Sequence, residues 1–164
     1  MSSEAEFKVK FLFFTAYQYQ HENSETYRNN CLLEIDSQTN ANGKDFEVEG
    51  NQVDDGFRIE ANKAEDMLVP ESRDACIKTF AYWDPSFLKE EKLLNSQTGE
   101  LLDVEVEKIA RETLTVRGQE VKAERYRLLA KNVEVDVWYS DADRCWLALE
   151  STVKGGRKLR YVLT

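Results

Sequence analysis

Residues 132–150 read NVEVDVWYSDADRCWLALE, and this stretch decides the fold class. In its first half apolar side chains recur at every second position, which is the pattern of a β-strand that buries one face. These positions are Val133, Val135, Val137 and Tyr139. The polar run SDADR then indicates a tight turn, after which Cys145, Leu147 and Leu149 resume the alternation. The stretch therefore predicts two antiparallel strands joined by a short turn.

Short alternating segments of this kind recur over most of the 164 residues. The turn signals between them include NANG at 40–43, DDG at 54–56, RGQE at 117–120 and KGG at 154–156. About ten short strands at a spacing of roughly ten residues predict a mainly β fold, a curved antiparallel sheet that forms a barrel or half-barrel. No change of composition marks a domain boundary, so we expect a single β-rich domain over residues 1–164.

The alternation changes phase between residues 121 and 128. Val121 and Ala123 share one parity, whereas Tyr126 and Leu128 share the other. A change of parity inside a strand is typical of a β-bulge, where one extra residue turns the following side chains to the opposite face. We therefore expect a bulge near Glu124 or Arg125.

The N-terminal strand is apolar on both faces near its end. Phe7, Val9, Phe11 and Phe13 share one face, and the pattern continues through Tyr17, Tyr19 and His21. Between residues 11 and 14 the sequence FLFF makes the second face apolar as well. Because a strand that is apolar on both sides must be covered on both sides, we expect the sheet to wrap around another element.

The stretch TFAYWDPSFLKEEKLLNSQTGE at residues 79–100 indicates the element around which the sheet is expected to wrap. Asp84 fits the N-cap position of a helix and Pro85 fits the first helical position, because a carboxylate accepts the free amides and proline needs no partner there. Good helix formers follow, and Gly99 suits a left-handed stop. We expect one short helix of about two to three turns, with the curved sheet wrapped around it. The side chains expected to face the sheet are Phe87, Leu88 and Leu94, near Phe11 and Phe13.

The formal charge limits the partners. The chain holds 22 Lys and Arg against 31 Asp and Glu, which gives a net charge of −9. Because such a surface repels phosphate backbones, we expect no nucleic-acid partner. We interpret the local basic stretch formed by Lys154, Arg157, Lys158 and Arg160 as a charged outer strand that resists aggregation.

No integral membrane segment is expected, because no apolar run reaches the roughly 18 to 20 residues of a membrane helix. The opening sequence MSSEAEFKVKFLFF lacks the pattern of a signal peptide, so the sequence read literally predicts a cytoplasmic location.

Neither a cofactor nor a metal is expected. His21 is the one histidine, whereas catalytic zinc and non-haem iron sites usually use two or three. No phosphate-binding glycine motif and no serine-hydrolase motif is present. The three cysteines, Cys31, Cys76 and Cys145, lack a C-x-x-C pair, so they form either one disulfide with a spare thiol or three thiols.

Two sets of residues are candidate functional sites. The first set is catalytic: His21 with Glu22 or Glu25, in which a carboxylate orients a general base. The second set consists of aromatic residues that line an apolar ligand cavity, with core packing as the alternative for each. Its members are Phe11, Phe13, Tyr17, Tyr82, Trp83 and Trp138. Among them Trp83 is expected to reach the cavity, because its indole closes an apolar wall while its N–H finds a polar partner.

Three stretches carry a resemblance to a known family: CLLEIDSQTNANG, FAYWDPSFLKEEKLLNSQTGELLDVEVE and VWYSDADRCWLALESTVKGGRKLRYVL. They resemble the DUF6134 family of small bacterial envelope proteins, and the resemblance covers essentially the whole chain. Its members carry a signal peptide and an extra N-terminal hairpin, which implies that residues 1–164 lack these parts of full-length relatives. The resemblance therefore implies the periplasm or cell envelope as the location. It also implies a disulfide between Cys31 and Cys76, with Cys145 as the spare thiol.

The family brings no established activity, and the functional expectation rests on the fold. The pattern is also similar to another envelope group, DUF3108, and to lipoprotein-carrier folds, in which a curved antiparallel sheet wraps a helix and shelters an acyl chain. We expect a non-catalytic binding protein that shelters a lipid or another apolar ligand in a half-barrel cavity. The alternatives are a small enzyme that uses His21 with Glu22 or Glu25, and a structural or assembly factor of the envelope.

Overall fold

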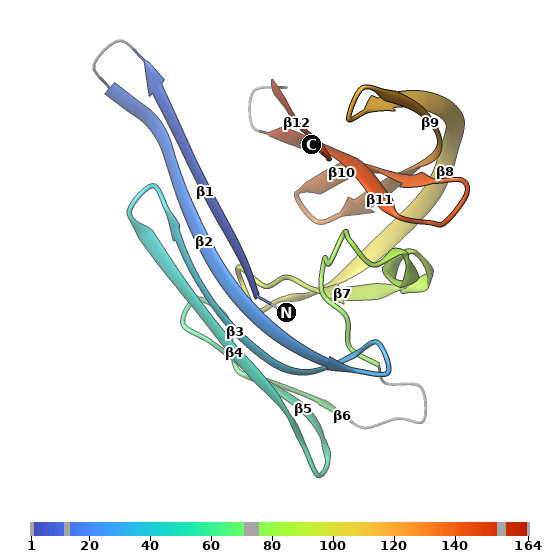
Figure 1. Ribbon diagram of the computed structural model, residues 1–164. Helices are drawn as coiled ribbons and strands as arrows, with labels where there is room; N and C mark the ends of the chain where they lie inside the picture. The colour runs from blue at the N-terminus through green and yellow to red at the C-terminus, as the bar shows by residue number, and fades with distance from the viewer. Residues whose placement is uncertain (1, 12–13, 71–75, 154–156, 164) are drawn as a thin grey trace. The chain divides into compact units, whose positions relative to one another are not determined.

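The computed structural model describes residues 2–11, 14–70, 76–153 and 157–163, and the chain divides into two compact units. Unit 1 comprises Met1–Thr79 and Leu94–Leu101, and unit 2 comprises Phe80–Leu93 and Leu102–Thr164. The fold is mainly β, and its sheets are antiparallel and curved in the manner of a half-barrel, as the bent strands β2 and β9 in Figure 1 show. The single domain over residues 1–164 stays a prediction.

Unit 1 is built on a six-stranded sheet in which neighbours in sequence are neighbours in space. Its strands are β1 (Ser2–Phe11), β2 (Phe14–Arg28), β3 (Cys31–Ala41), β4 (Lys44–Val53), β5 (Gly56–Ala61) and β6 (Met67–Pro70), blue to green in Figure 1. Asn42 and Gly43 join β3 to β4 with φ values of 54° and 77°, which is the geometry that the NANG turn predicts.

The strands β1 and β2 extend past the rest of this sheet as a ribbon. The pairing of β2 with β3 ends at Tyr19, which lies opposite Ala41. Towards the N-terminal end of β2 the described register continues with β1 alone, through Val9 opposite Tyr17 to Phe11 opposite Phe14. A two-stranded ribbon is marginally stable in water by itself.

The core of unit 1 lies on the inner face of its sheet. Its buried strand residues are Leu32, Ile35, Val48, Phe57 and Ile59. The irregular segment around residue 77 and the end of strand β7 (Lys92–Leu94) complete this core by contributing Ile77 and Leu94. Backbone hydrogen bonds fix them, from the Leu32 amide to the Ile77 carbonyl at 2.9 Å and from the Leu94 amide to the Lys78 carbonyl at 2.8 Å.

The turn at 95–100 packs closely on the same face. Gly99 has a φ of 75°, and a Cβ at this position would lie 2.6 Å from the Cβ of Ala61 in β5. Glycine is therefore required both by the backbone conformation and by the contact. The prediction that a helix covers this sheet is wrong, because within unit 1 the cover consists of the segments around Ile77 and Gly99.

A disulfide joins Cys31 and Cys76, whose Cα atoms are 4.9 Å apart, and Cys145 is an exposed free thiol. This confirms the pairing implied by the family resemblance. The bridge ties the segment after residue 75 to the start of β3, directly beside the hydrogen bond between Leu32 and Ile77. The disulfide therefore holds the cover of unit 1 in place.

Unit 2 contains most of the second sheet, also six-stranded and also in sequence order. Its strands are β7 (Lys92–Leu94), β8 (Leu101–Val116), β9 (Gln119–Ala130), β10 (Val133–Ser140), β11 (Trp146–Val153) and β12 (Arg157–Val162). The hairpin predicted from residues 132–150 is confirmed by the antiparallel pairing of β10 with β11. Figure 1 shows these strands in yellow to red.

Two cores lie on the opposite faces of β10. Val135, Val137 and Tyr139 belong to one, and Trp138 belongs to the other together with Leu147 and Ala148. Successive side chains of a strand point to opposite faces, so β10 is buried on both sides. The run from Val135 to Ser140 is buried at every position, which agrees with this placement.

The one short helix predicted after Asp84 is wrong in length and type. Asp84 is the N-cap, and its carboxylate accepts a hydrogen bond from the Ser86 amide at 2.9 Å, so the predicted start is confirmed. The structure there is a 3₁₀ turn, η1 (Pro85–Lys89), and the chain is extended again at Glu90. Leu93 and Leu94 then pack into two different cores. An extended segment allows this, because adjacent side chains point to opposite faces. Burial thus overrides the helix propensity.

Within the part of the chain that the structure describes, no helix has the length and apolar character needed to cross a membrane.

Candidate functional site

A polar cluster lies on the inner face of unit 1, around Glu25 in β2. The Glu25 side chain is buried and accepts hydrogen bonds from Asn23 Nδ2 at 2.8 Å and from the Tyr27 hydroxyl at 2.7 Å. Thr79, from the segment that the disulfide holds, donates a third at 3.2 Å. The Tyr27 and Thr79 hydroxyls are also 2.9 Å apart. Three hydrogen bonds therefore satisfy the buried carboxyl group of Glu25.

His21 lies on the same face of β2 and hydrogen-bonds a hydroxyl. Its Nδ1 atom is 2.7 Å from Thr39 Oγ1 in β3, the residue directly opposite it in the sheet. Burial lowers the pKa of His21, and the charge of Glu25 opposes this shift. Burial therefore favours the neutral form of the imidazole.

The three catalytic candidates are not brought together. Glu22 follows His21 in the strand and is exposed on the opposite face. Glu25 shares the face of His21 but lies four residues further on, about 13 Å along the strand. Among the described hydrogen bonds, the one that His21 makes joins it to Thr39.

Two buried polar atoms of the inner face have no hydrogen-bond partner among the described residues. They are Asn23 Oδ1 and Ser37 Oγ, and the two residues lie opposite each other in β2 and β3. A buried polar atom without a partner costs free energy, on the order of 1–3 kcal/mol. The inner face therefore has capacity for further hydrogen bonds at this point.

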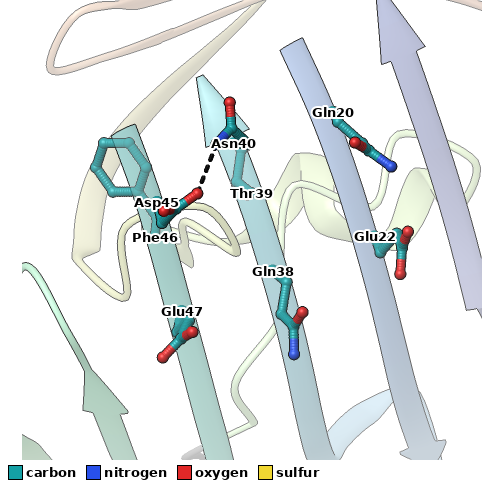
Figure 2. A pocket seen from close by; sticks show the side chains of 8 residues that line it. All are labelled: Gln20, Glu22, Gln38, Thr39, Asn40, Asp45, Phe46 and Glu47. Atoms are coloured by element: carbon teal, nitrogen blue, oxygen red, sulfur yellow. Dashed lines mark hydrogen bonds between the residues drawn. The ribbon is translucent and has the colours of Figure 1, made fainter. Parts of the chain in front are cut away.

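A shallow pocket of about 200 Å³ lies on the outer face of the same strands. Its polar side chains form two rows across β2, β3 and β4, as Figure 2 shows. The rows are Gln20, Asn40 and Asp45, and Glu22, Gln38 and Glu47. Asn40 donates to Asp45 at 2.6 Å, the dashed line in Figure 2. Three carboxylates and three amides make this pocket suited to solvent or a polar solute rather than to an apolar ligand.

The comparison with known families matches residues 1–164 to the family described as Domain of unknown function (DUF6134). The chain belongs to the DUF6134 family. The match spans both units, and therefore includes the Glu25 cluster, the disulfide and the outer pocket alike. Among curated proteins, none matches this chain.

The aromatic candidates of this DUF6134 chain are divided between its units. Tyr82 packs edge-on against Phe87 at 5.9 Å between ring centroids, and its carbonyl accepts the Tyr139 hydroxyl at 2.6 Å. Trp138 is buried in the other core of unit 2 and donates its indole N–H to Glu112. Because Tyr82 and Trp138 lie in cores on opposite faces of β10, they do not line one cavity.

The remaining aromatic candidates include one exposed residue and three whose side chains the structure does not describe. Trp83 is 45% exposed and belongs to none of the three cores. Phe13 lies outside the described residues, and for Phe11 and Tyr17 only the backbone positions in β1 and β2 are described. Their part in ligand binding stays a prediction.

Sequence reasoning missed the partners of the polar cluster. Thr79 reaches Glu25 across a separation of 54 residues, and no local pattern predicts such a contact. The opposite faces of His21 and Glu22, however, follow from strand parity alone. No group of three or more His, Cys, Asp or Glu side chains within the described ranges is placed to hold a metal ion.

Proposed function

We propose that this chain is a non-catalytic binding protein that shelters a lipid or another apolar molecule in the half-barrel of unit 1. The observation that carries the proposal is the ribbon of β1 and β2, which continues the curved sheet beyond the pairing with β3. The sequence between Val9 and Tyr17, where β1 ends and β2 begins, reads VKFLFFTAY and has aromatic residues at 11, 13, 14 and 17.

Such a ribbon needs a further surface. A two-stranded hairpin is marginally stable alone, and burying one large apolar side chain contributes roughly 1.5–3 kcal/mol. An apolar molecule lying along the ribbon supplies this burial without a helix. The 3₁₀ turn η1 and Trp83 belong to unit 2, so neither is needed for binding along this ribbon.

The polar part of the inner face suits the other end of an amphiphile. Asn23 Oδ1 can accept a hydrogen bond there, and Ser37 Oγ can accept or donate one. The two residues lie opposite each other in β2 and β3, beyond the ribbon. A protonated carboxyl group or an alcohol head group supplies the donor that Asn23 Oδ1 lacks. We therefore favour a fatty acid or a similar single-chain lipid over a purely hydrocarbon ligand.

The cell envelope or periplasm is the location that agrees with this function. A disulfide between Cys31 and Cys76 persists in oxidising compartments, and the family resemblance implies the same place. The acid–base alternative gains no support from the hydrogen bond between His21 and Thr39. A structural or assembly role is the outcome if no apolar ligand binds.

A fluorescent long-chain fatty acid tests the proposal. Titration into the full chain is expected to give saturable binding, which Phe11→Ser weakens about tenfold because one large apolar contact is lost. Leu68→Ser is the matched control, because Leu68 is an exposed apolar strand residue of the same unit, away from the ribbon. Equal binding by both variants, or no saturable binding by the unmodified chain, contradicts the proposal.

A further inference from the structure

Three cationic side chains of unit 2 converge on one buried carboxylate. Glu124 in β9 has a side chain that is 9% exposed and accepts hydrogen bonds from Lys108, Arg111 and Arg144. Arg111 Nη2 and Arg144 Nη1 lie 3.0 Å and 2.6 Å from its two oxygens. The Tyr126 hydroxyl donates to the same carboxylate at 2.6 Å.

A β-bulge places two of these cations on one face. Lys108 and Arg111 are three residues apart, so a regular strand would direct them to opposite faces. The register of β8 against β9 shifts between Lys108 and Ala110, where β8 carries one extra residue. The prediction of a bulge at Glu124 or Arg125 is wrong in its strand, because β9 pairs with β10 without a shift and the extra residue lies in β8, opposite Arg125 and Tyr126. Bulges of this kind commonly re-aim side chains next to functional sites.

Arg144 reaches the same point from the turn between β10 and β11. Its φ is 61°, a left-handed conformation that is costly for a residue with a Cβ. Its guanidinium lies over the rings of Tyr126 and Tyr139, 5.4 Å and 5.7 Å from the centroids. The two ring contacts restrict the orientation of the guanidinium.

The cations outnumber the charge that they neutralise. Against Lys108, Arg111 and Arg144 stand Glu124 and Asp141, the latter 3.8 Å from Arg111 Nε. The local charge is thus three minus two, or +1, in a chain of net charge −9. The Lys108 hydrogen bond, followed by that of Tyr126, lowers the pKa of Glu124 to about 2, so the carboxylate is charged throughout the physiological range.

The ends of the cations remain accessible. Their side chains are 44%, 69% and 42% exposed for Lys108, Arg111 and Arg144, whereas Glu124 lies beneath them. An arginine has five N–H donors and a lysine three, more than the contacts to Glu124 use. Like charges held close together at a surface repel one another, and an added anion relieves this repulsion.

We propose that Lys108, Arg111 and Arg144 form a binding site for a phosphate group, with Glu124 as the residue that positions them. Guanidinium groups bind phosphate oxygens through paired hydrogen bonds, and the lysine adds a point charge. The inference rests on unit 2 alone and is independent of the apolar ligand of unit 1. The phosphate belongs either to a free small molecule or to a lipid head group.

Titration of inorganic phosphate into the full chain, followed by NMR at constant ionic strength, tests the site. We expect saturable shifts of the amides around Glu124, and a dissociation constant about tenfold weaker in Arg111→Gln. The matched control is Lys158→Gln, because Lys158 is also exposed in unit 2 and also bonds a carboxylate, Glu150 at 2.7 Å. The control is expected to bind phosphate as the unmodified chain does. Lys108→Gln is the second variant at the site, and its phosphate binding is measured in the same way.

A second arm identifies the source of the phosphate. Vesicles of phosphatidylcholine with and without phosphatidic acid are sedimented with the protein. Binding that needs phosphatidic acid and is lost in Arg111→Gln assigns the site to a lipid head group, whereas binding of inorganic phosphate alone assigns it to a free phosphate. The proposal is overturned if neither probe binds, or if Lys158→Gln weakens binding as much as the site variants do.

Discussion

Removal of the disulfide should cost a large part of the stability of unit 1. The bridge between Cys31 and Cys76 closes a loop with a sequence separation of 45. The chain-entropy relation for such a loop gives about 4 kcal/mol at 25 °C, most of which comes from the unfolded chain. The bridge also holds the segment that carries Ile77 and Thr79 against the inner face. Its loss therefore weakens the hydrogen bond between Leu32 and Ile77 and the one between Thr79 and Glu25.

The assay is urea unfolding of Cys31→Ser/Cys76→Ser, followed by circular dichroism. The Cys145→Ser variant is the control, because Cys145 is exposed and unbridged, and we expect its free energy of unfolding to stay within about 0.5 kcal/mol of the unmodified chain. A loss below about 1 kcal/mol in the double variant would refute the view that the bridge restrains the cover of unit 1.

Three further changes test individual contacts. Thr79→Val removes a buried hydrogen bond to Glu25 at nearly constant shape, and should lower the free energy of unfolding by about 1–3 kcal/mol in urea titration. Trp83→Ala should cost less than about 1 kcal/mol by the same measurement, because nearly half of the residue is exposed and it lies outside the cores; a core-sized loss would contradict that position. His21 has a pKa below its unfolded value of about 6.5, so the unfolded chain takes up the proton first and stability falls as the pH drops from 6.5 through the lowered pKa. His21→Gln should therefore lose less stability than the unmodified chain between neutral and mildly acidic pH, and an equal loss would exclude a buried neutral histidine.

The sequence predicted features that are encoded locally. The hairpin at 132–150 follows from alternation and a polar turn, and the Asn42–Gly43 turn follows from the backbone freedom of these two residues. The cap at Asp84 is also encoded locally, because its hydrogen-bond partner, the Ser86 amide, is only two residues away.

Features that depend on distant contacts escaped prediction. Residues 90–94 carry good helix formers, yet Leu93 and Leu94 fill two separate cores and the chain is extended. No local sequence pattern reveals that these adjacent leucines belong to separate cores. The pairing of Thr79 with Glu25, and of Arg144 with Glu124, also depends on the assembled sheets. The family resemblance supplied the disulfide, which spacing alone left open.

Native mass spectrometry of the full chain tests whether unit 1 holds an apolar ligand. The protein is purified gently from bacterial cells, and its spectrum is recorded before and after incubation with a long-chain fatty acid. The account predicts the 19.0 kDa chain with one added lipid, which Phe11→Ser loses and Leu68→Ser retains. A spectrum that shows the 19.0 kDa chain alone under both conditions contradicts the claim that unit 1 shelters an apolar ligand.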